Sequence, residues 1–207
     1  MYLPRLFQEQ DPERLIAFMK RYSFATLVTV EDGAPFVSHL PFLVEPGSGG
    51  SKGRLLGHMA RANPQWRAFS EARDVLVIFQ GPHTYVSPSW YVTEPNVPTW
   101  SYAVVHAHGR PRVVTEQDEW MRILRDTTDT YEAGFEKPWT VERAGEFVSR
   151  ILPGTVAFEI SLSSVEGKFK LSQNRAPEDR RAVMEHLERS EDPEQRAVGA
   201  LMRERDV

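Results

Sequence analysis

The alternation of apolar and polar positions near the N-terminus predicts one helix and then a β-hairpin. Apolar side chains recur at helical spacing within 11–23, a segment that starts with an Asp-Pro pair. Asp11 suits the N-cap and Pro12 suits the first helical position. The β-forming runs 24–30 and 35–45 are joined by the turn sequence EDGAP, which favours a hairpin with a positive φ at its glycine.

The same patterns predict further strands and helices along the rest of the chain. β-forming runs predict strands at 54–60, 74–81, 83–91, 99–114 and 155–171. Runs with helical periodicity predict helices at 63–72, 115–132, 140–152, 177–190 and 193–205. Asn63 is the expected cap of the first of these helices, and Thr115 with Asp118 predicts a capping box at the second.

Together these elements predict a mainly β, α+β fold. Strands in consecutive hairpins leave exposed edges unless the sheet closes on itself, so a small antiparallel barrel with flanking helices is the expected architecture. An open α+β sandwich is the alternative. We expect residues 1–172 to form the barrel domain and residues 173–207 to form a C-terminal helical extension packed on the same domain.

Composition narrows the classes of protein that remain. The 207 residues are 41% hydrophobic and 26% charged, values typical of a globular domain with a sizeable core. A formal net charge of −4 gives no global attraction to nucleic acid. The absence of cysteine excludes disulfides, Cys-ligated metals and thiol catalysis. The sequence shows no signal-peptide pattern and no apolar run of membrane-spanning length, so we expect a cytoplasmic protein without membrane contact.

The segment 53–66 contains a candidate anion site. A strand ends there, a turn carries Arg61, and a helix starts near Asn63, whose first-turn N–H groups attract negative charge. An anion bound there could also be reached by three other cationic side chains, Arg67, Lys52 and Arg54. The alternative is an ordinary capped surface helix with solvated arginines. The residues alone favour that alternative, because the segment contains neither a P-loop nor a G-x-G-x-x-G motif.

The ribbon 81–109 concentrates aromatic side chains that carry polar tips. Tryptophan and tyrosine suit places with one apolar side and one hydrogen-bonding side, and they stack on flat rings. The ribbon therefore predicts core packing, a dimer interface or the wall of a pocket for a flat ligand. Its aromatic residues are Tyr85, Trp90, Tyr91, Trp100 and Tyr102.

His106 and His108 share a face of one predicted strand and are the beginning of a candidate metal site. No established metal-ligand spacing accompanies them, so histidines that hydrogen-bond in or near a pocket are the favoured interpretation and no metal is expected. A third ligand would have to come from His39, His58, His83 or Glu159.

Two other groups of polar residues allow chemical interpretations. The serines Ser87, Ser89 and Ser101 lie near histidines in sequence, but no G-x-S-x-G elbow is present, so a hydrolase is not favoured. The segment 168–174 ends the last predicted strand with lysines and amides, which indicates either an exposed strand end or a lid over a phosphate or ring edge. No helix-turn-helix, zinc finger or basic stripe indicates DNA binding.

Four longer motifs resemble a known family. They are GRLLGHMARANPQW, TYVSPSWY, VPTWSYAVVHAHGRPR and GKFKLSQNR, which occur in this order within a similarity that runs nearly end to end. This pattern resembles the PaiB family of FMN-binding negative transcriptional regulators. The resemblance implies an FMN-binding split barrel, related to pyridoxamine-phosphate oxidases and small flavin reductases, with FMN as cofactor. It also implies a homodimer with the flavin at the interface.

The resemblance further implies where the cofactor binds. The strand-to-helix turn would grip the phosphate, the segment SHLP would run beside the isoalloxazine, and the polar end of KLSQN would close the site. The cofactor-binding residues expected on this basis are Ser38, His39, Leu40, Pro41, His58, Met59, Ala60, Arg61, Ala62, Asn63, Pro64, Gln65, Trp100, Lys170, Ser172, Gln173 and Asn174. Ser101 stands where the family pattern has asparagine, which shortens the reach of that side chain.

Two functions remain as hypotheses. The first is an FMN-dependent oxidoreductase or redox-responsive regulator, in which the flavin carries the chemistry and no catalytic side chain is assigned. The second is a negative transcriptional regulator that acts through DNA or protein binding, with flavin absent or sensory only. Haem binding through a clustered histidine is a third, weaker interpretation.

Overall fold

The computed structural model describes residues 1–71 and 73–205, apart from the side chains of residues 70 and 71. This part of the chain divides into two compact units. Unit 1 contains residues 1–18, 80–105 and those from 166 onward, whereas unit 2 contains residues 19–79 and 106–165. The domain division expected from the sequence, with a boundary at residue 172, remains a prediction.

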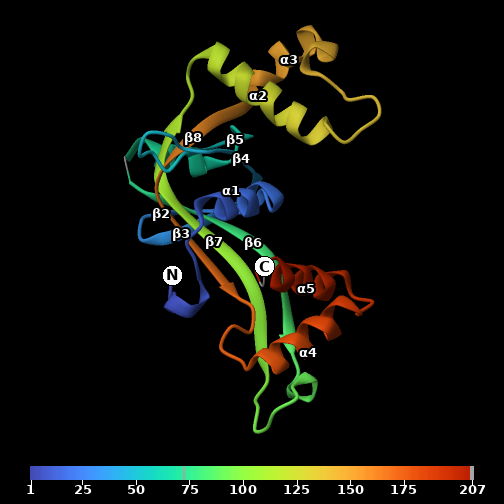
Figure 1. Cartoon of the computed structure of the whole chain (residues 1–207). Helices are drawn as coiled ribbons and strands as arrows, with labels where there is room; N and C mark the ends of the chain where they lie inside the picture. Colours follow the sequence, from blue (N-terminus) through green and yellow to red (C-terminus); the bar gives the residue numbers. More distant parts are fainter. Residues whose placement is uncertain (72, 206–207) are drawn as a thin grey trace. The chain divides into compact units, whose positions relative to one another are not determined.

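The strands form one eight-stranded sheet in the order β3-β2-β6-β7-β8-β5-β4, with β1 paired to β8. The register fixes the pairs β1–β8, β2–β3, β2–β6, β4–β5 and β5–β8, and all of them are antiparallel. The antiparallel sheet with flanking helices confirms the predicted fold class (Figure 1). The strands are β1 Gln8–Glu9, β2 Phe24–Glu31, β3 Ala34–Pro41, β4 Leu43–Glu45, β5 Arg54–Ala60, β6 Val75–Val86, β7 Thr99–Val113 and β8 Thr155–Lys170.

Most of the α-helices lie close to the ranges that the sequence predicts. The α-helices are α1 Pro12–Arg21, α2 Gln117–Glu132, α3 Glu146–Ile151, α4 Pro177–Glu188 and α5 Pro193–Arg205. The Asp11 carboxylate accepts a hydrogen bond from the Glu13 N–H at 2.9 Å, which confirms Asp11 as the cap of α1. The hairpin turn has φ 50° at Asp32 and 81° at Gly33, as a two-residue turn between β2 and β3 requires.

Three strand predictions were wrong in their boundaries. The strands expected at 74–81 and 83–91 are one strand, β6, which ends at Val86. The next residues form a 3₁₀ turn that Ser87 caps. The run 35–45 is divided into β3 and β4, because Phe42 turns into the core and its N–H bonds to the Ser23 carbonyl at 2.9 Å.

Three helix predictions also need correction. The helix expected at 63–72 is a 3₁₀ helix, η2, at Pro64–Glu71, and its last expected position lies outside the described residues. The capping box is absent, because Glu116 is the N-cap of α2 and makes no side-chain cap bond. The helix expected at 140–152 is interrupted at Gly145, where φ is 50°.

The core of unit 2 is rich in aromatic side chains. Phe42 packs edge-on against Phe79 and Phe158, with ring centroids 6.1 and 6.0 Å apart. Gly57 permits this packing, since a Cβ there would lie 2.9 Å from the Phe158 ring. Leu55, like these residues, is fully or almost fully buried. The closely packed core holds β5, which leads into the candidate anion turn, in place.

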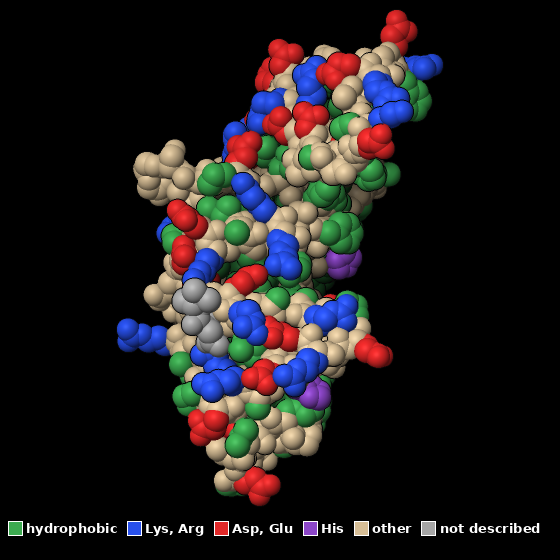
Figure 2. All heavy atoms as spheres, turned by 45° about the vertical axis from the view of Figure 1, so that its right-hand side comes forward, with side chains coloured by type: hydrophobic (Ala, Val, Ile, Leu, Met, Phe, Trp, Pro, Cys, Tyr) green, Lys and Arg blue, Asp and Glu red, His purple; other side chains and the backbone are tan. Residues whose placement is uncertain are grey.

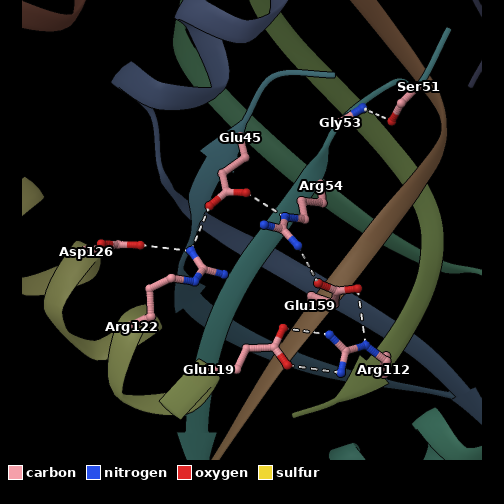
Figure 3. A network of polar contacts seen from close by, with 9 residues as sticks. All are labelled: Glu45, Ser51, Gly53, Arg54, Arg112, Glu119, Arg122, Asp126 and Glu159. Atoms are coloured by element: carbon pink, nitrogen blue, oxygen red, sulfur yellow. Dashed lines mark hydrogen bonds and ion pairs between the residues drawn. The ribbon is translucent and has the colours of Figure 1, made fainter. Parts of the chain in front are cut away.

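A chain of alternating charges fastens α2 to the strands of unit 2 (Figure 3). Glu159, a buried carboxylate on β8, accepts hydrogen bonds from Arg54 at 3.1 Å and from Arg112 at 3.2 Å. Arg112 continues to Glu119 on α2 at 2.7 Å. At the other end, Glu45 accepts from Arg54 at 2.5 Å and from Arg122 of α2 at 3.2 Å. Each buried or half-buried charge therefore has an opposite partner, as burial requires.

In unit 1, α4 and α5 lie side by side (Figure 1). Their contact buries Val183, Leu187, Val198 and Met202. The first turn of α4 also carries Asp179, a buried carboxylate. It accepts hydrogen bonds from the backbone N–H groups of residues 92 and 93 at 2.7 and 2.8 Å, and from the Thr93 hydroxyl at 2.6 Å. The loop that precedes β7 is thus tied to α4.

Candidate functional site

The turn between β5 and η2 is bonded to the inner face of the β2–β3 hairpin. Asn63 Nδ2 donates a hydrogen bond to Ser38 Oγ at 2.8 Å, and Asn63 Oδ1 accepts one from the Gln65 N–H at 3.0 Å. The second bond confirms Asn63 as the cap of η2. Two segments expected at the cofactor site, 38–41 and 58–65, are therefore brought together within unit 2.

Gln65 anchors this arrangement from inside the core. Its side chain is fully buried, and its amide donates to the carbonyls of Leu27 at 3.2 Å and Phe36 at 3.1 Å, and to Thr29 Oγ1 at 3.3 Å. Its Oε1 atom is buried without a hydrogen-bond partner. A buried amide with this many bonds fixes the position of the turn relative to both hairpin strands.

Arg61 supplies a positive charge at the turn. Its guanidinium donates from Nε to the Pro153 carbonyl at 2.7 Å and from Nη2 to the Thr155 carbonyl at 3.0 Å. It also lies over the Trp66 ring, 5.7 Å from the centroid. Among the described residues no carboxylate pairs with Arg61 within 4 Å. The geometry therefore holds the guanidinium in place with neutral partners and leaves its charge without a carboxylate.

The two histidines of these segments have different surroundings. His39 lies on the outward face of β3, where Nδ1 is 3.1 Å from Thr26 Oγ1. His58 is half-buried on β5, with its ring 6.2 Å from that of Trp120. Burial lowers the pKa of His58 below its ordinary value, because the charged imidazolium is poorly solvated there. At neutral pH His58 is thus a neutral hydrogen-bonding group.

The other predicted cofactor-binding residues of unit 2 belong to the same two segments, 38–41 and 58–65. Met59 is buried, whereas four others are exposed or half-buried: Leu40, Pro41, Ala60 and Pro64. Ala62 is exposed in the turn itself. Arg54 was a candidate to reach the anion, but its guanidinium is paired with Glu45 and Glu159 in the charge chain. Arg67, like Arg61, lies over the Trp66 ring, 5.8 Å from its centroid.

The other predicted site residues lie in unit 1. Lys170 Nζ donates to the Trp100 carbonyl at 2.6 Å and to Thr99 Oγ1. The pKa of Lys170 lies below its ordinary value, first because burial disfavours the ammonium and then because Lys168 and Arg175 are close cations. The sequence prediction placed Lys168 and Lys170 in the candidate lid segment but did not name Arg175, which the run of cations in GKFKLSQNR could have indicated.

The turn after β8 holds Ser172, Gln173 and Asn174. Ser172 is buried with φ 62°, and its hydroxyl has no hydrogen-bond partner. Gln173 closes the turn on itself, since its side chain accepts from the Leu171 N–H at 2.6 Å and donates to the Phe169 carbonyl at 2.5 Å. A non-glycine residue in this backbone region is strained, and such residues concentrate at functional sites.

The aromatic ribbon forms an open groove on unit 1. Residues of β6 and β7 line a hollow of about 380 Å³, namely Gln80, Gly81, His83, Trp100, Tyr102, Ala103 and Val104. The Trp100 ring stacks on that of His83 with centroids 6.2 Å apart, and Tyr85 meets it edge-on at 6.2 Å. The ribbon is therefore partly a groove wall and partly packing, since Trp90 stacks on His186 of α4 at 4.0 Å.

The sequence also indicated a candidate metal site at His106 and His108 and a group of serines near histidines. His106 and His108 are half-buried between buried neighbours on β7, which confirms that they share a face. Of the third ligands considered for them, Glu159 is bonded to two arginines and His83 lies 3.2 Å from Glu194. Ser87 and Ser89 bond to each other at 2.8 Å.

Charged side chains of both signs cover the face shown in Figure 2. Lys and Arg side chains are interspersed there with Asp and Glu side chains, so that face has no continuous basic stripe. None of the described helices is long and apolar enough to cross a membrane.

Sequence comparison finds close relatives over the whole chain. Residues 1–164 match the family described as "Putative FMN-binding domain". "Protease synthase and sporulation protein PAI 2" of Bacillus subtilis is 37% identical over 206 residues, which cover 99% of this chain and 98% of that protein. An uncharacterised protein of Emericella nidulans is 32% identical over 203 residues, 81% of each chain.

Structural comparison finds the same fold in more distant proteins. The flavocytochrome Anf3 of Azotobacter vinelandii has a TM-score of 0.59 at 16% identity, over 94% of this chain and 78% of that chain. A FAD- and haem-binding protein of Mycobacterium smegmatis has a TM-score of 0.55 at 20% identity, over 79% of this chain and 73% of that chain. At these identities the likeness concerns the fold.

Proposed function

This chain belongs to the PaiB family of FMN-binding split-barrel proteins, and on that premise we propose that it is a flavoprotein that binds FMN with the phosphate at the β5–η2 turn. The observation that carries the proposal is the bond from Asn63 to Ser38, which joins the turn to the β3 segment expected beside the isoalloxazine. Family membership favours FMN over FAD or haem, which the more distant flavin proteins bind.

The residues of the turn fit a phosphate in charge and chemistry. Arg61, Asn63 and Ser38 offer guanidinium, amide and hydroxyl groups, all of which donate hydrogen bonds to an anion. The Arg61 charge has no carboxylate partner among the described residues. An anion in this place would also meet the N-terminus of η2, where the helix dipole favours negative charge.

We assign distinct tasks to the side chains of the two segments. Arg61 and Asn63 bind and orient the phosphate, and Gln65 holds the turn against the hairpin. His58 is neutral at neutral pH, so its half-buried imidazole adds no positive charge to the site. When bound, FMN supplies hydride or electron transfer, so the chain needs to contribute binding, orientation and water exclusion but no nucleophile.

A homodimer with the flavin at its interface is part of the proposal. Phe24 and Val30 of β2 and Val37 of β3 are 69%, 55% and 48% exposed on the outward face of the hairpin. Contiguous exposed apolar surface of this kind marks interaction sites. The covered face would belong to the same β3 strand that carries Ser38 on its inner side, so the partner subunit would lie close to the proposed flavin site.

Titration of FMN by quenching of its fluorescence tests the assignment. We expect Arg61→Gln to weaken FMN binding at least about tenfold, because a charge-assisted bond to phosphate contributes about 1.5–3 kcal/mol. Arg61→Lys, which keeps the charge, should lose less affinity. The matched control is Arg150→Gln, another exposed arginine over an aromatic ring, at 5.6 Å from Phe147, and it should bind FMN like the parent protein. Equal affinity of all variants would contradict the proposed phosphate site.

A further inference from the structure

We propose that unit 1 carries a second ligand site, for a planar aromatic anion distinct from FMN, in the groove formed by β6 and β7 beside the end of β8. The ring of the ligand would lie on the groove's aromatic wall, and its carboxylate would meet the Lys168 ammonium. This inference goes beyond the proposed flavin site, all of whose assigned residues lie in unit 2, and it assigns Trp100 and Lys170 to the second ligand rather than to the flavin.

The wall of the groove presents aromatic surface to solvent. Trp100 is 53% exposed, although tryptophan is among the side chains that gain most from burial. His83 and Tyr85 hold the indole from two sides, one stacked and one edge-on. Tyr102, two residues further along β7, lies on the same face and lines the same hollow. A rigid row of exposed rings of this kind suits stacking on a flat ligand.

Cations stand at one side of this wall. Lys168 Nζ lies over the Tyr102 ring, 5.5 Å from its centroid, and over the Tyr2 ring at 5.1 Å. Lys170 is bonded to the backbone of Trp100, so the second ammonium adjoins the same strand. Arg175 is close enough to Lys170 to contribute to the low pKa of that lysine. Three positive charges therefore gather where the aromatic wall meets the end of β8.

Neutral groups make the direct contacts of these cations. Lys168 donates to the Tyr2 carbonyl at 3.0 Å, and Arg175 donates to Asn96 Oδ1 at 2.5 Å. No carboxylate of the described residues pairs with Lys168, Lys170 or Arg175 within 4 Å. The Asp179 carboxylate, on which the Arg175 charge also acts, already accepts three hydrogen bonds from the loop at 92–93.

The other carboxylates of this region have different partners. Glu194 accepts a hydrogen bond from the His83 N–H at 3.0 Å. Glu166 lies 2.8 Å from the amino group of Met1. An uncompensated cluster of like charges is costly, and an anion that binds there relieves the repulsion. Aromatic wall and cation cluster together select a ligand that is both flat and negatively charged.

Calorimetric titration of FMN-saturated protein with 2-naphthoate tests this site. We expect 2-naphthoate to bind, whereas 2-naphthamide, which lacks the charge, and adamantane-1-carboxylate, which lacks the flat ring, should bind at least about tenfold more weakly. Lys168→Gln and Tyr102→Leu should each weaken 2-naphthoate binding by about the same factor. Lys168→Arg should restore it, and Lys20→Gln, which removes an exposed lysine of unit 2, should leave it unchanged.

Three outcomes would overturn the second site. Equal binding of 2-naphthoate and 2-naphthamide would remove the role of the cations. Equal binding by the parent protein and by correctly folded Lys168→Gln and Tyr102→Leu variants would place the probe elsewhere. Release of FMN by 2-naphthoate, or a parallel loss of FMN affinity in Lys168→Gln, would make the groove part of the flavin site. If FMN does not bind at all, the same titrations on the flavin-free protein still decide whether the groove takes the anion.

Discussion

Asn63 Nδ2 donates a hydrogen bond to Ser38 Oγ at 2.8 Å across 25 positions of sequence, while the other amide atom of the same side chain caps η2. One asparagine thus couples the start of a helix to the inner face of a hairpin. The coupling matters because FMN is proposed to contact both segments. A site made of two segments that move independently would lose the orientation on which ligand affinity depends.

Two replacements of Asn63 distinguish the contribution of its cap bond from that of its bond to Ser38. Asn63→Ala removes the cap and the bond to Ser38, and we expect it to lower the free energy of unfolding by about 1–2 kcal/mol. Asn63→Asp keeps the cap oxygen but replaces the Nδ2 donor by a carboxylate oxygen and adds a negative charge, so it should retain most of the stability but not the FMN affinity. Urea unfolding and FMN titration of both variants measure the two effects, and equal stability losses in both would argue against the cap.

Gln65 is expected to be the most sensitive position of the turn. Gln65→Leu leaves three acceptors, two of them in buried bonds, without the amide donor, and it should cost about 2–4 kcal/mol of unfolding free energy. Gln65→Glu should cost at least as much, because it buries a carboxylate among carbonyl oxygens. Thermal unfolding checks both variants. A change below about 0.5 kcal/mol would mean that the amide does not hold the turn.

The sequence predicted most of this arrangement because the relevant signals are local. Asp11 and Asn63 are confirmed as caps, and a cap depends on the few residues that follow it. The antiparallel strands also followed from local periodicity. Thr115 failed as a capping residue because Glu116 takes that position without a side-chain bond.

Features that depend on contacts between distant parts of the chain could not be predicted from local sequence patterns. The split of the run 35–45 depends on Phe42 finding its place in the core, and the length of β6 depends on its neighbours in the sheet. The family resemblance implied that both 58–65 and the KLSQN segment, 170–174, are parts of one cofactor site, but only contacts in three dimensions assign them to different compact units. The aromatic surroundings of Lys168 likewise come from far apart in the chain, since Lys168 lies over the rings of both Tyr2 and Tyr102.

The charge chain of unit 2 should be cooperative and sensitive to salt. Arg112→Gln removes one partner of the buried Glu159, and it should lower stability by about 1 kcal/mol, since Arg112 itself is half exposed. The double variant with Glu159→Gln should lose less than the sum of the two single variants. A double-mutant cycle by urea unfolding at low and high salt measures the coupling, and strict additivity would show that the two residues act independently.

His58 should make stability depend on pH. Its folded pKa lies below the ordinary value of 6.5, so the unfolded chain binds the proton first as the pH falls. Stability should therefore decrease from about pH 6.5 down to the folded pKa, with a slope of at most about 1.4 kcal/mol per pH unit from this residue, and level off below it. His58→Asn should remove this component, and an unchanged profile in that variant would assign it to other groups.

Asp179 should control the loop before β7. Hydrogen bonds from Thr93, and those from the backbone N–H groups, hold the pKa of Asp179 below its ordinary value. Its stabilising contribution is thus present above about pH 3.8 and is lost as the pH falls through the folded pKa. Asp179→Asn should speed amide hydrogen exchange at residues 92 and 93 at neutral pH. Unchanged exchange would show that the loop is held by other contacts.

The most direct test of the central claim is the visible spectrum of the purified protein, recorded before and after addition of FMN and gel filtration. We expect flavin bands that remain with the protein at about one FMN per chain and bleach with a reductant. A colourless protein that retains no FMN, or a haem Soret band in place of the flavin bands, would contradict the proposed FMN binding.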